Sequence, residues 1–281
     1  MKFRFFILTY KAKNRLEKCA RALANSDAKD CEIFIINNHS DFSMPSSFSD
    51  LPNVKVLNNE LRADWSTGHM SRSWNQALLF GFESLKNPSC DAVVTIQDDV
   101  AVVSDVIFKL KHLHKERNFS FVQNGHGDAL CSYLPEAIIK SGMWDERFLM
   151  GLGAADYFYR QLMFNADGCS INDPQHERYH NLIYKNHKSR SAYFLVSSDR
   201  CQDTTISDDT FSTGGQYWID PDLDVRIGSK IIDLKYGYRL SPWDKQLIER
   251  SKSKKINSPN FIQYSFFEKD IPNLEEKGYL V

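Results

Sequence analysis

The sequence predicts an α/β protein with a doubly wound, mostly parallel sheet in its first half and a less regular α+β second half. Up to about residue 125, apolar runs of strand length alternate with stretches whose apolar residues recur at helical spacing. Hydrophobic residues make up 42% of the 281 positions, enough to cover a sheet on both faces. Lys plus Arg (35) nearly balance Asp plus Glu (36), which argues against a generally basic nucleic-acid-binding protein.

The first half contains five apolar runs that read as strands. Between them lie three stretches with the apolar spacing of helices. Since strands that alternate with helices run parallel, we expect one sheet with helices on both faces. The predicted strands are 2–9, 32–37, 54–57, 92–97 and 119–123, and the predicted helices are 14–26, 70–85 and 106–113.

The second half shows weaker periodicity. Residues 135–141 read as a short helix that begins with proline, and 155–164 read as another helix. Residues 203–228 are expected to form loops with short strands, and the basic stretch 246–258 an exposed helix or linker. No sharp linker separates the halves 1–125 and 126–281, so we expect a single compact unit.

Cysteine usage and apolar segments favour a cytoplasmic protein. The six cysteines are scattered without a CxxC pair, which fits free thiols in a reducing compartment. No segment approaches the roughly 18 to 20 apolar residues that cross a bilayer. The apolar run near the start is shorter than that of a signal peptide and lacks a small-residue cleavage site, so a buried strand is expected there.

Polar residues follow three of the predicted strands. In an open α/β sheet, ligands bind beyond the carboxyl ends of the strands, which meet at one edge. Turn residues are common at strand ends in any protein, but two adjacent carboxylates repel each other unless a cation or hydrogen-bond donors offset their charge. The polar ends are Thr9 and Tyr10, the run Asn37 to Asp41, and Gln97, Asp98 and Asp99.

Four segments in sequence order resemble the large inverting, family-2-like group of GT-A-fold glycosyltransferases. They are FILTYKAKNRLEKCARAL, IFIINNHSD, TIQDDV and SGMWDERFLMGLGAADYFYR. The resemblance runs from the start to roughly residue 180. It implies a GT-A-like unit in which residues 1–125 bind a nucleotide-sugar and residues 126–281, with a C-terminal extension, bind the acceptor.

The same resemblance implies roles for individual residues. Asp99 would bind Mn²⁺ or Mg²⁺, and Asp156 would be the general base. Two positions depart from the family pattern: Gln97 replaces the first acid of the metal motif, and Ala155 stands where glutamate is common. We therefore expect the metal to bind weakly and together with the nucleotide. The implied donor-binding residues are Thr9, Tyr10, Asn38, Asp64, Asn75 and Asp98.

His176 and His180 form an H-E-x-x-H pattern, which is also a signature of zinc peptidases. Pro174 lies where a peptidase helix should continue, and no glutamate follows between residues 178 and 248 as a third ligand. In the glycosyltransferase interpretation, either histidine would complete the metal shell. The sequence does not decide between them, and a pair of ordinary surface histidines is an equal alternative.

The sequence therefore predicts a metal-assisted, inverting hexosyl- or related transferase of polysaccharide biosynthesis. Its donor would be a nucleoside-diphosphate sugar, with a UDP-sugar favoured, and its acceptor a hydroxyl of a glycan or lipid-linked glycan. A catalytically idle relative that only binds nucleotide or glycan is the alternative that Gln97 and Ala155 leave open. The basic residues between Arg250 and Lys255 suit either peripheral contact with the inner face of a membrane or a plain solvated surface.

Overall fold

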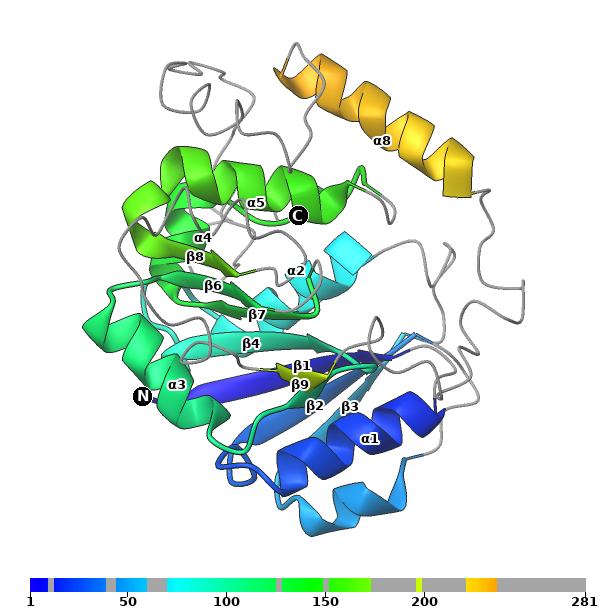
Figure 1. Ribbon diagram of the computed structural model, residues 1–281, viewed down its shortest axis with the longest axis vertical. Helices are drawn as coiled ribbons and strands as arrows, with labels where there is room; N and C mark the ends of the chain where they lie inside the picture. Colours follow the sequence, from blue (N-terminus) through cyan, green and yellow to red (C-terminus); the bar gives the residue numbers. More distant parts are fainter. Residues whose placement is uncertain are drawn as a thin grey trace, which may run out of the picture.

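The structure, a computed structural model, describes residues 1–9, 13–38, 44–59, 70–124, 128–148, 152–172, 196–198 and 221–236. Within these residues, helices cover both faces of a seven-stranded sheet (Figure 1). Its strand order is β3-β2-β1-β4-β7-β6-β8. The strands are β1 (Phe3–Thr9), β2 (Glu32–Asn37), β3 (Val54–Asn58), β4 (Ala92–Gln97), β6 (Phe121–Asn124), β7 (Leu130–Tyr133) and β8 (Cys169–Asn172). A separate two-stranded sheet pairs β5 (Ala101–Val102) with β9 (Val196–Ser198).

Two groups of helices cover the sheet, one on each face. One face carries α1 (Lys13–Ala24) and α3 (Val106–Lys111), which continues as a π-helical turn over His112–Glu116. The other face carries α2 (Met70–Phe82), α4 (Pro135–Ser141) and α5 (Gly153–Phe164). The helix α8 (Pro221–Tyr236) lies beyond α5, on the side away from the sheet (Figure 1). Two short 3-10 segments, Ser46–Asp50 and Ala166–Gly168, complete the described elements.

The sheet is parallel except for one strand. β1 pairs in parallel with β2 and β4, and β2 with β3, whereas β7 is antiparallel to both of its neighbours, β4 and β6. From β1 the chain proceeds outward to β2 and β3 and then returns to place β4 on the opposite side of β1. The strand order therefore reverses between β1 and β4, the place where open α/β sheets bind ligands.

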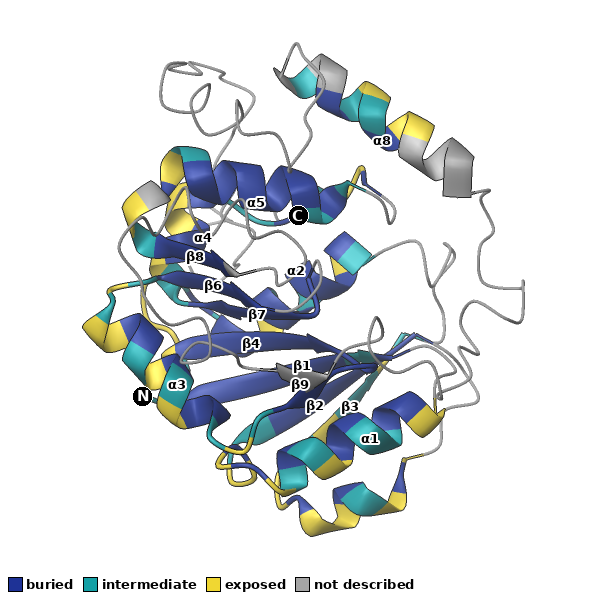
Figure 2. Ribbon diagram, viewed as in Figure 1, coloured by how far each residue is buried: buried dark blue, intermediate teal, exposed yellow. Residues whose placement is uncertain are grey.

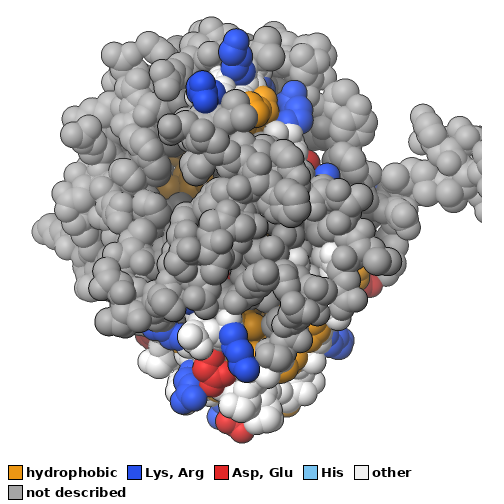
Figure 3. Space-filling model, turned by 90° about the vertical axis from the view of Figure 1, so that its right-hand side faces the viewer, with side chains coloured by type: hydrophobic (Ala, Val, Ile, Leu, Met, Phe, Trp, Pro, Cys, Tyr) orange, Lys and Arg blue, Asp and Glu red, His pale blue; other side chains and the backbone are white. Residues whose placement is uncertain are grey.

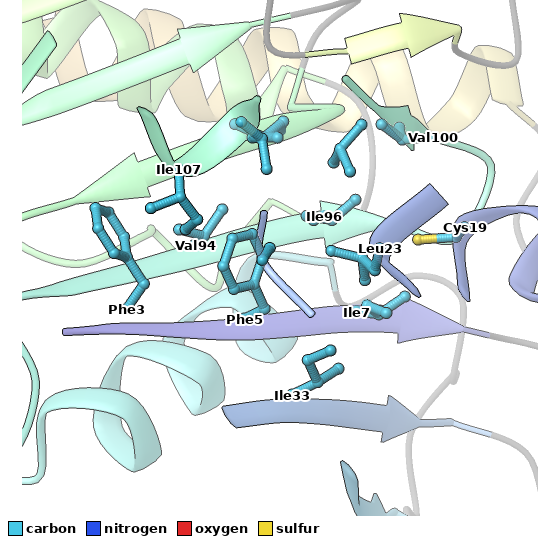
Figure 4. Close-up of a cluster of buried hydrophobic side chains, with 14 of the residues drawn as sticks. Phe3, Phe5, Ile7, Cys19, Leu23, Ile33, Val94, Ile96, Val100 and Ile107 are labelled. Carbon is cyan, nitrogen blue, oxygen red and sulfur yellow. The ribbon is translucent and has the colours of Figure 1, made fainter. Parts of the chain in front are cut away.

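Alternating residues of the strands divide the interior into two cores, and both are buried (Figure 2). Phe5 and Ile7 of β1 face α1, where they pack with Leu23 and Ile96 (Figure 4). Phe6, between them, faces the α2 side. Gly81 permits the close approach of α2 to β4, because a Cβ there would lie 2.2 Å from Val93 Cγ2.

The predicted fold class is confirmed. The predicted strands and helices of the first half agree with the observed ones at their cores, with differences at the ends. One expectation is wrong: residues 221–228, predicted as loops with short strands, begin helix α8. Residues 246–258 lie outside the described residues. Among the described residues, no helix combines the length and apolarity needed to span a membrane.

Candidate active site

Thr9 and Asp98 meet where the strand order reverses. Thr9 is the last residue of β1, and Asp98 directly follows β4. Thr9 Oγ1 donates a 2.7 Å hydrogen bond to Asp98 Oδ2, and Arg15 Nε of helix α1 lies 3.7 Å from Asp98 Oδ1. All three side chains are buried. The carboxylate of Asp98 is therefore held in place by neighbours from β1 and α1.

Asp99 adds a second buried carboxylate beside Asp98. Beneath them, burial together with the charges of Asp98 and Asp99 raises the pKa of the Cys19 thiol far above its usual range, so this thiol stays protonated. Two adjacent carboxylates provide oxygen ligands, the kind that Mg²⁺ and Mn²⁺ prefer. The described residues contain no group of three or more His, Cys, Asp and Glu side chains that would hold a metal by themselves. The Asp98 and Asp99 carboxylates therefore suit a cation whose other ligands include phosphate oxygens.

Gln97, the departure from the metal motif, hydrogen-bonds to a carboxylate that lies just before β7. Its Nε2 donates to Asp128 Oδ1 at 2.6 Å. Trp74 Nε1 of helix α2 donates to the other oxygen of Asp128 at 2.5 Å. Asp128 lies just before β7 and is 7% exposed. The amide of Gln97 thus joins β4 to a buried carboxylate that an acid at the same position would repel.

Side-chain amides connect the ends of β2 and β3 to helix α2. Asn38 donates from Nδ2 to Ser73 Oγ at 3.2 Å and accepts from Asn59 Nδ2 at 2.8 Å. Asn59 also exchanges hydrogen bonds with Gln76 of α2. The backbone N–H of Asn38 donates to the carbonyl of Thr9. Asn38 therefore lies next to Thr9, as the sequence prediction of a shared strand edge requires.

Asn75 points toward the segment that follows α4. Its Nδ2 donates to the carbonyl of Trp144 and to Glu146 Oε1, both at 2.9 Å, and its Oδ1 accepts from the backbone N–H of Trp144 at 2.8 Å. Both amide hydrogens are thus used within the protein. Trp144 is itself buried and stacks on Tyr157, with ring centroids 4.3 Å apart. The contacts of Asn75 connect helix α2 to this segment of the second half.

Asp156, in the first turn of α5, is completely buried among charged side chains. Arg160 Nε lies 3.0 Å from its Oδ2, and Lys235 Nζ of helix α8 lies 2.7 Å from its Oδ1. Lys235 Nζ also lies 2.8 Å from Asp145 Oδ2. Burial by itself raises the pKa of Asp145, but Arg147 and Lys235 outweigh this effect and leave that pKa well below its usual range. Burial lowers the pKa of Lys235 although Asp156 and Asp145 oppose the shift.

The structure therefore separates the predicted site residues into groups. Thr9, Asn38, Asp98 and Asp99 lie at the carboxyl edge of the sheet. Figure 3 shows the face of the molecule on that side, on which the visible described Lys and Arg side chains lie toward the top and the bottom. Asn75 and Asp156 are held in hydrogen-bond and ion-pair networks toward the second half. The predicted residues Tyr10, Asp64, His176 and His180 lie outside the described residues.

Asp128 and Lys235 are among the residues of these networks that sequence reasoning missed. Asp128 precedes a four-residue strand, LCSY, whose composition gives no clear periodic signal. Lys235 lies in α8, within a stretch whose only notable feature is a helical apolar spacing at Ile227, Ile231 and Leu234. That spacing was the available signal for the helix.

Several solved structures have similar folds. Residues 1–349 of TarS from S. aureus match with 14% identity over 69% of this chain and 68% of that chain, at a TM-score of 0.46. A mannosyltransferase from Pyrobaculum calidifontis in complex with GDP-Man and Mn²⁺ matches with 11% identity. The match covers 90% of this chain and 80% of that chain, at a TM-score of 0.43. A third match, with 9% identity, is glucosyl-3-phosphoglycerate synthase from Mycobacterium tuberculosis in complex with Mn²⁺, UDP and glucosyl-3-phosphoglycerate. It covers 61% of this chain and 69% of that chain, at a TM-score of 0.42.

These similarities concern the fold alone. Against a longer TarS chain, this chain spans 41% of the length. No protein-family model matches the sequence. No curated protein matches it either.

Proposed function

We propose that this protein transfers a sugar from a nucleoside-diphosphate sugar to a hydroxyl of a glycan or lipid-linked glycan, with inversion at the anomeric carbon. The observation that carries the proposal is the Thr9–Asp98 hydrogen bond, with Asp99 beside it, at the reversal of the strand order. This is the position at which open α/β sheets bind nucleotides. The GT-A resemblance of the sequence points to the same strand ends.

In this proposal the first half binds the donor. Thr9, Tyr10 and Asn38 contact the nucleotide, Asp64 helps to hold it, and Asp98 reaches the ribose or the metal shell. Asn75 also helps to hold the nucleotide or ribose, and its three hydrogen bonds hold the Trp144 segment against α2. The amides around Asn38 give neutral donors and acceptors, which suit a nucleobase and ribose.

A divalent cation, Mn²⁺ or Mg²⁺, would be held by Asp99 and by His176 or His180, together with the diphosphate. When bound, it stabilises the negative charge that develops on the leaving diphosphate. The oxygen-only character of the Asp98–Asp99 pair supports this choice of ion. Weak, nucleotide-dependent binding follows from Gln97, which is engaged with Asp128.

Asp156 is the proposed general base. The acceptor hydroxyl gives its proton to an oxygen of Asp156, its oxygen forms a bond to the anomeric carbon, and the bond from that carbon to the diphosphate oxygen breaks. Attack opposite the leaving group inverts the configuration in one step. The ion pairs with Arg160 and Lys235 orient the carboxylate of Asp156, but they also compete with the acceptor for its oxygens.

A nucleotide-binding protein without transferase activity is the second candidate. The complete burial of Asp156 and the engagement of Gln97 with Asp128 favour it. The two candidates share the donor site and differ only in turnover. Hydrolysis of a nucleotide-sugar in the absence of acceptor therefore separates them.

The first experiment is a thermal-shift measurement with UDP, GDP, TDP and CMP, each with and without Mn²⁺. Saturation at about 100 times Kd stabilises a fold by roughly 2.7 kcal/mol, which such a measurement detects. We expect one diphosphate to raise the melting temperature only when Mn²⁺ is present. Asp99→Ala should lose that rise, whereas Asp30→Ala, which removes an exposed carboxylate elsewhere, should keep it.

Two outcomes would overturn the proposal. One is the absence of a shift with every nucleotide, and the other is a shift produced by Zn²⁺ alone, which would favour the peptidase reading of His176 and His180. If a nucleotide binds, Asp156→Asn should retain its affinity and lose transfer. Transfer at the wild-type rate in Asp156→Asn would exclude Asp156 as the base.

A further inference from the structure

Helix α8 contacts α5 through both apolar and charged side chains. Ile232 is completely buried against Phe148 and Tyr159. Three residues further along α8, Lys235 inserts its ammonium group between Asp145 and Asp156. The side chain of Lys235 is only 11% exposed, and its Nζ lies 5.8 Å from the centre of the Phe148 ring.

Lys235 is the cation that α8 contributes to this buried group of charges. Arg160, the other cation on Asp156, belongs to the same helix as Asp156 and lies four residues away. It also donates to the carbonyl of Ser141 at 2.5 Å. Arg160 would therefore stay beside Asp156 if α8 moved, and it would keep the carboxylate oriented.

In its observed position, Lys235 blocks the role of general base that we propose for Asp156. An acceptor hydroxyl must come within hydrogen-bond distance of a carboxylate oxygen to pass its proton on. Lys235 Nζ already lies within that distance of Oδ1, and Arg160 Nε already lies within that distance of Oδ2. With Asp156 at 0% exposure, neither acceptor nor water reaches it in this arrangement.

We propose that α8 closes over the acceptor side of the site, and that Lys235 is the positioning residue that holds it closed by binding Asp145 and Asp156. Opening of α8 withdraws Lys235 and exposes Asp156 Oδ1 to the acceptor. This inference rests on the proposed function for the role of Asp156. The ion pairs and the apolar contacts of α8, which define the closed state, do not depend on the proposed function.

Small docked segments open locally more easily than a whole domain unfolds. Among the described side chains of α8, Ile231 and Ile232 make the apolar contact and Lys235 makes the ion pairs. Removing the cation should favour the open state, because two buried carboxylates then lose a partner. Removing the Ile232 side chain should favour it by a different route that leaves all the charges in place.

Carboxyl labelling with glycine ethyl ester and a carbodiimide, read out by mass spectrometry, measures the exposure of Asp156 directly. We expect Asp156 to be protected in the wild type and to be labelled roughly tenfold faster or more in Lys235→Met. Lys230→Met removes an exposed lysine from the same helix and should leave the labelling rate unchanged. Lys235→Arg, which keeps the cation, should restore most of the protection.

Ile232→Ala keeps the test decisive if Lys235→Met fails to fold. It should also accelerate labelling of Asp156, although every charged side chain is retained. If Asp156 stays protected in folded Lys235→Met, or in folded Ile232→Ala when Lys235→Met does not fold, α5 and its other neighbours bury Asp156 without α8. The proposal is then overturned.

Donor hydrolysis links the closed state to the reaction. UDP-glucose, UDP-GlcNAc and GDP-mannose serve as probes, with water in place of the acceptor. Water gives a proton to Asp156 as its oxygen bonds to the anomeric carbon and the diphosphate leaves. Lys235→Met should hydrolyse the donor several-fold faster than Lys230→Met, with nucleotide affinity unchanged.

The two proposals fail separately in these experiments. Faster labelling without any nucleotide binding would retain the closing of α8 and reject the transferase. Nucleotide binding with equal labelling in all folded variants would retain the donor site and reject the role of α8.

Discussion

Thr9 Oγ1 donates a hydrogen bond to Asp98 Oδ2 across the two strands between which the order of the sheet reverses. One oxygen of Asp98 is therefore directed by β1, and the other faces Arg15 of α1. The carboxylate is oriented by the fold before any ligand arrives. A site whose polar groups are already in place loses less entropy when its ligand binds.

Replacing Thr9 by valine removes this hydrogen bond and keeps the shape of the side chain. We expect Thr9→Val to lose about 1–3 kcal/mol of unfolding free energy, since a buried carboxylate oxygen loses a donor. Urea denaturation measures the loss, and Thr9→Ser, which keeps the hydroxyl, is the matched control. Equal stability of Thr9→Val and the wild type would mean that the hydrogen bond contributes nothing.

Placing an acid at position 97 should destabilise this protein. Gln97→Glu places a carboxylate against Asp128, where Gln97 Nε2 now donates at 2.6 Å. Two close buried carboxylates cannot both ionise easily, so we expect a loss of about 1–3 kcal/mol at pH 7 and a smaller loss at pH 5. The pH dependence of urea denaturation provides the measurement.

The double variant Gln97→Glu with Asp128→Asn exchanges the two groups and returns one amide and one carboxylate to the pair. It should recover most of the lost stability. If Gln97→Glu is as stable as the wild type, or if the double variant recovers none of the loss, the Gln97–Asp128 contact is not formed in solution.

Asn75 should behave as a connector between the halves of the protein. In Asn75→Asp, an oxygen replaces the amide nitrogen that donates to the Trp144 carbonyl and to Glu146. We expect a loss of about 1–3 kcal/mol in chemical denaturation, because a buried acceptor is left without its donor and two carboxylates are brought together. Asn53→Asp makes the same charge change at an exposed position and should cost much less.

The environment of Trp144 supplies a second readout for this variant. Its ring lies flat on Tyr157 in the wild type, so its near-ultraviolet dichroism reports on that packing. An unchanged spectrum together with unchanged stability would mean that the hydrogen bonds of Asn75 do not hold the Trp144 segment against α2.

His114 should make the fold sensitive to acid. Burial lowers its pKa to about 4, against an ordinary value of 6.5, and the ring is neutral, with Nδ1 donating to the Phe119 carbonyl and Ser132 Oγ donating to Nε2. The unfolded chain therefore takes up a proton at a higher pH than the folded protein does. Stability is full above about pH 6.5 and falls as the pH drops toward 4, by about 3 kcal/mol from this group.

Urea denaturation between pH 7 and pH 4 measures this loss. His114→Gln should have a lower stability at pH 7 and a shallower decline with acid. Parallel declines in the two proteins would assign the acid sensitivity to other groups.

The fold was predictable from local signals. The strands β1, β2 and β4 are long apolar runs, and α1 and α2 carry apolar residues at helical spacing, so periodicity identified them. The strands β7 and β8 have four residues each and mix Cys and Ser with apolar residues. Their pairing depends on contacts with distant strands, which periodicity does not report.

The edge residues were predictable for a similar reason. Thr9, Asn38 and Asp98 follow strands, and the strand order alone brings them to one edge. The surroundings of Asp156 were not predictable, because Lys235 is 79 residues away in sequence and its contact is a tertiary one. The family pattern suggested a role for Asp156 and said nothing of the cation beside it.

The reversed strand β7 limits how freely the carboxyl edge of this sheet can vary in sequence. A parallel strand reaches the carboxyl edge once and then returns through a helix, but β6 ends at that edge and β7 begins there, with Asn124 opposite Leu130. The hairpin thus brings two consecutive stretches of chain to the same rim. Part of this connection reaches the interior, because Asp128 accepts hydrogen bonds from Gln97 of β4 and Trp74 of α2. We expect related sequences to keep these three residues or to replace them together, because a change in one alone leaves a buried polar partner unsatisfied.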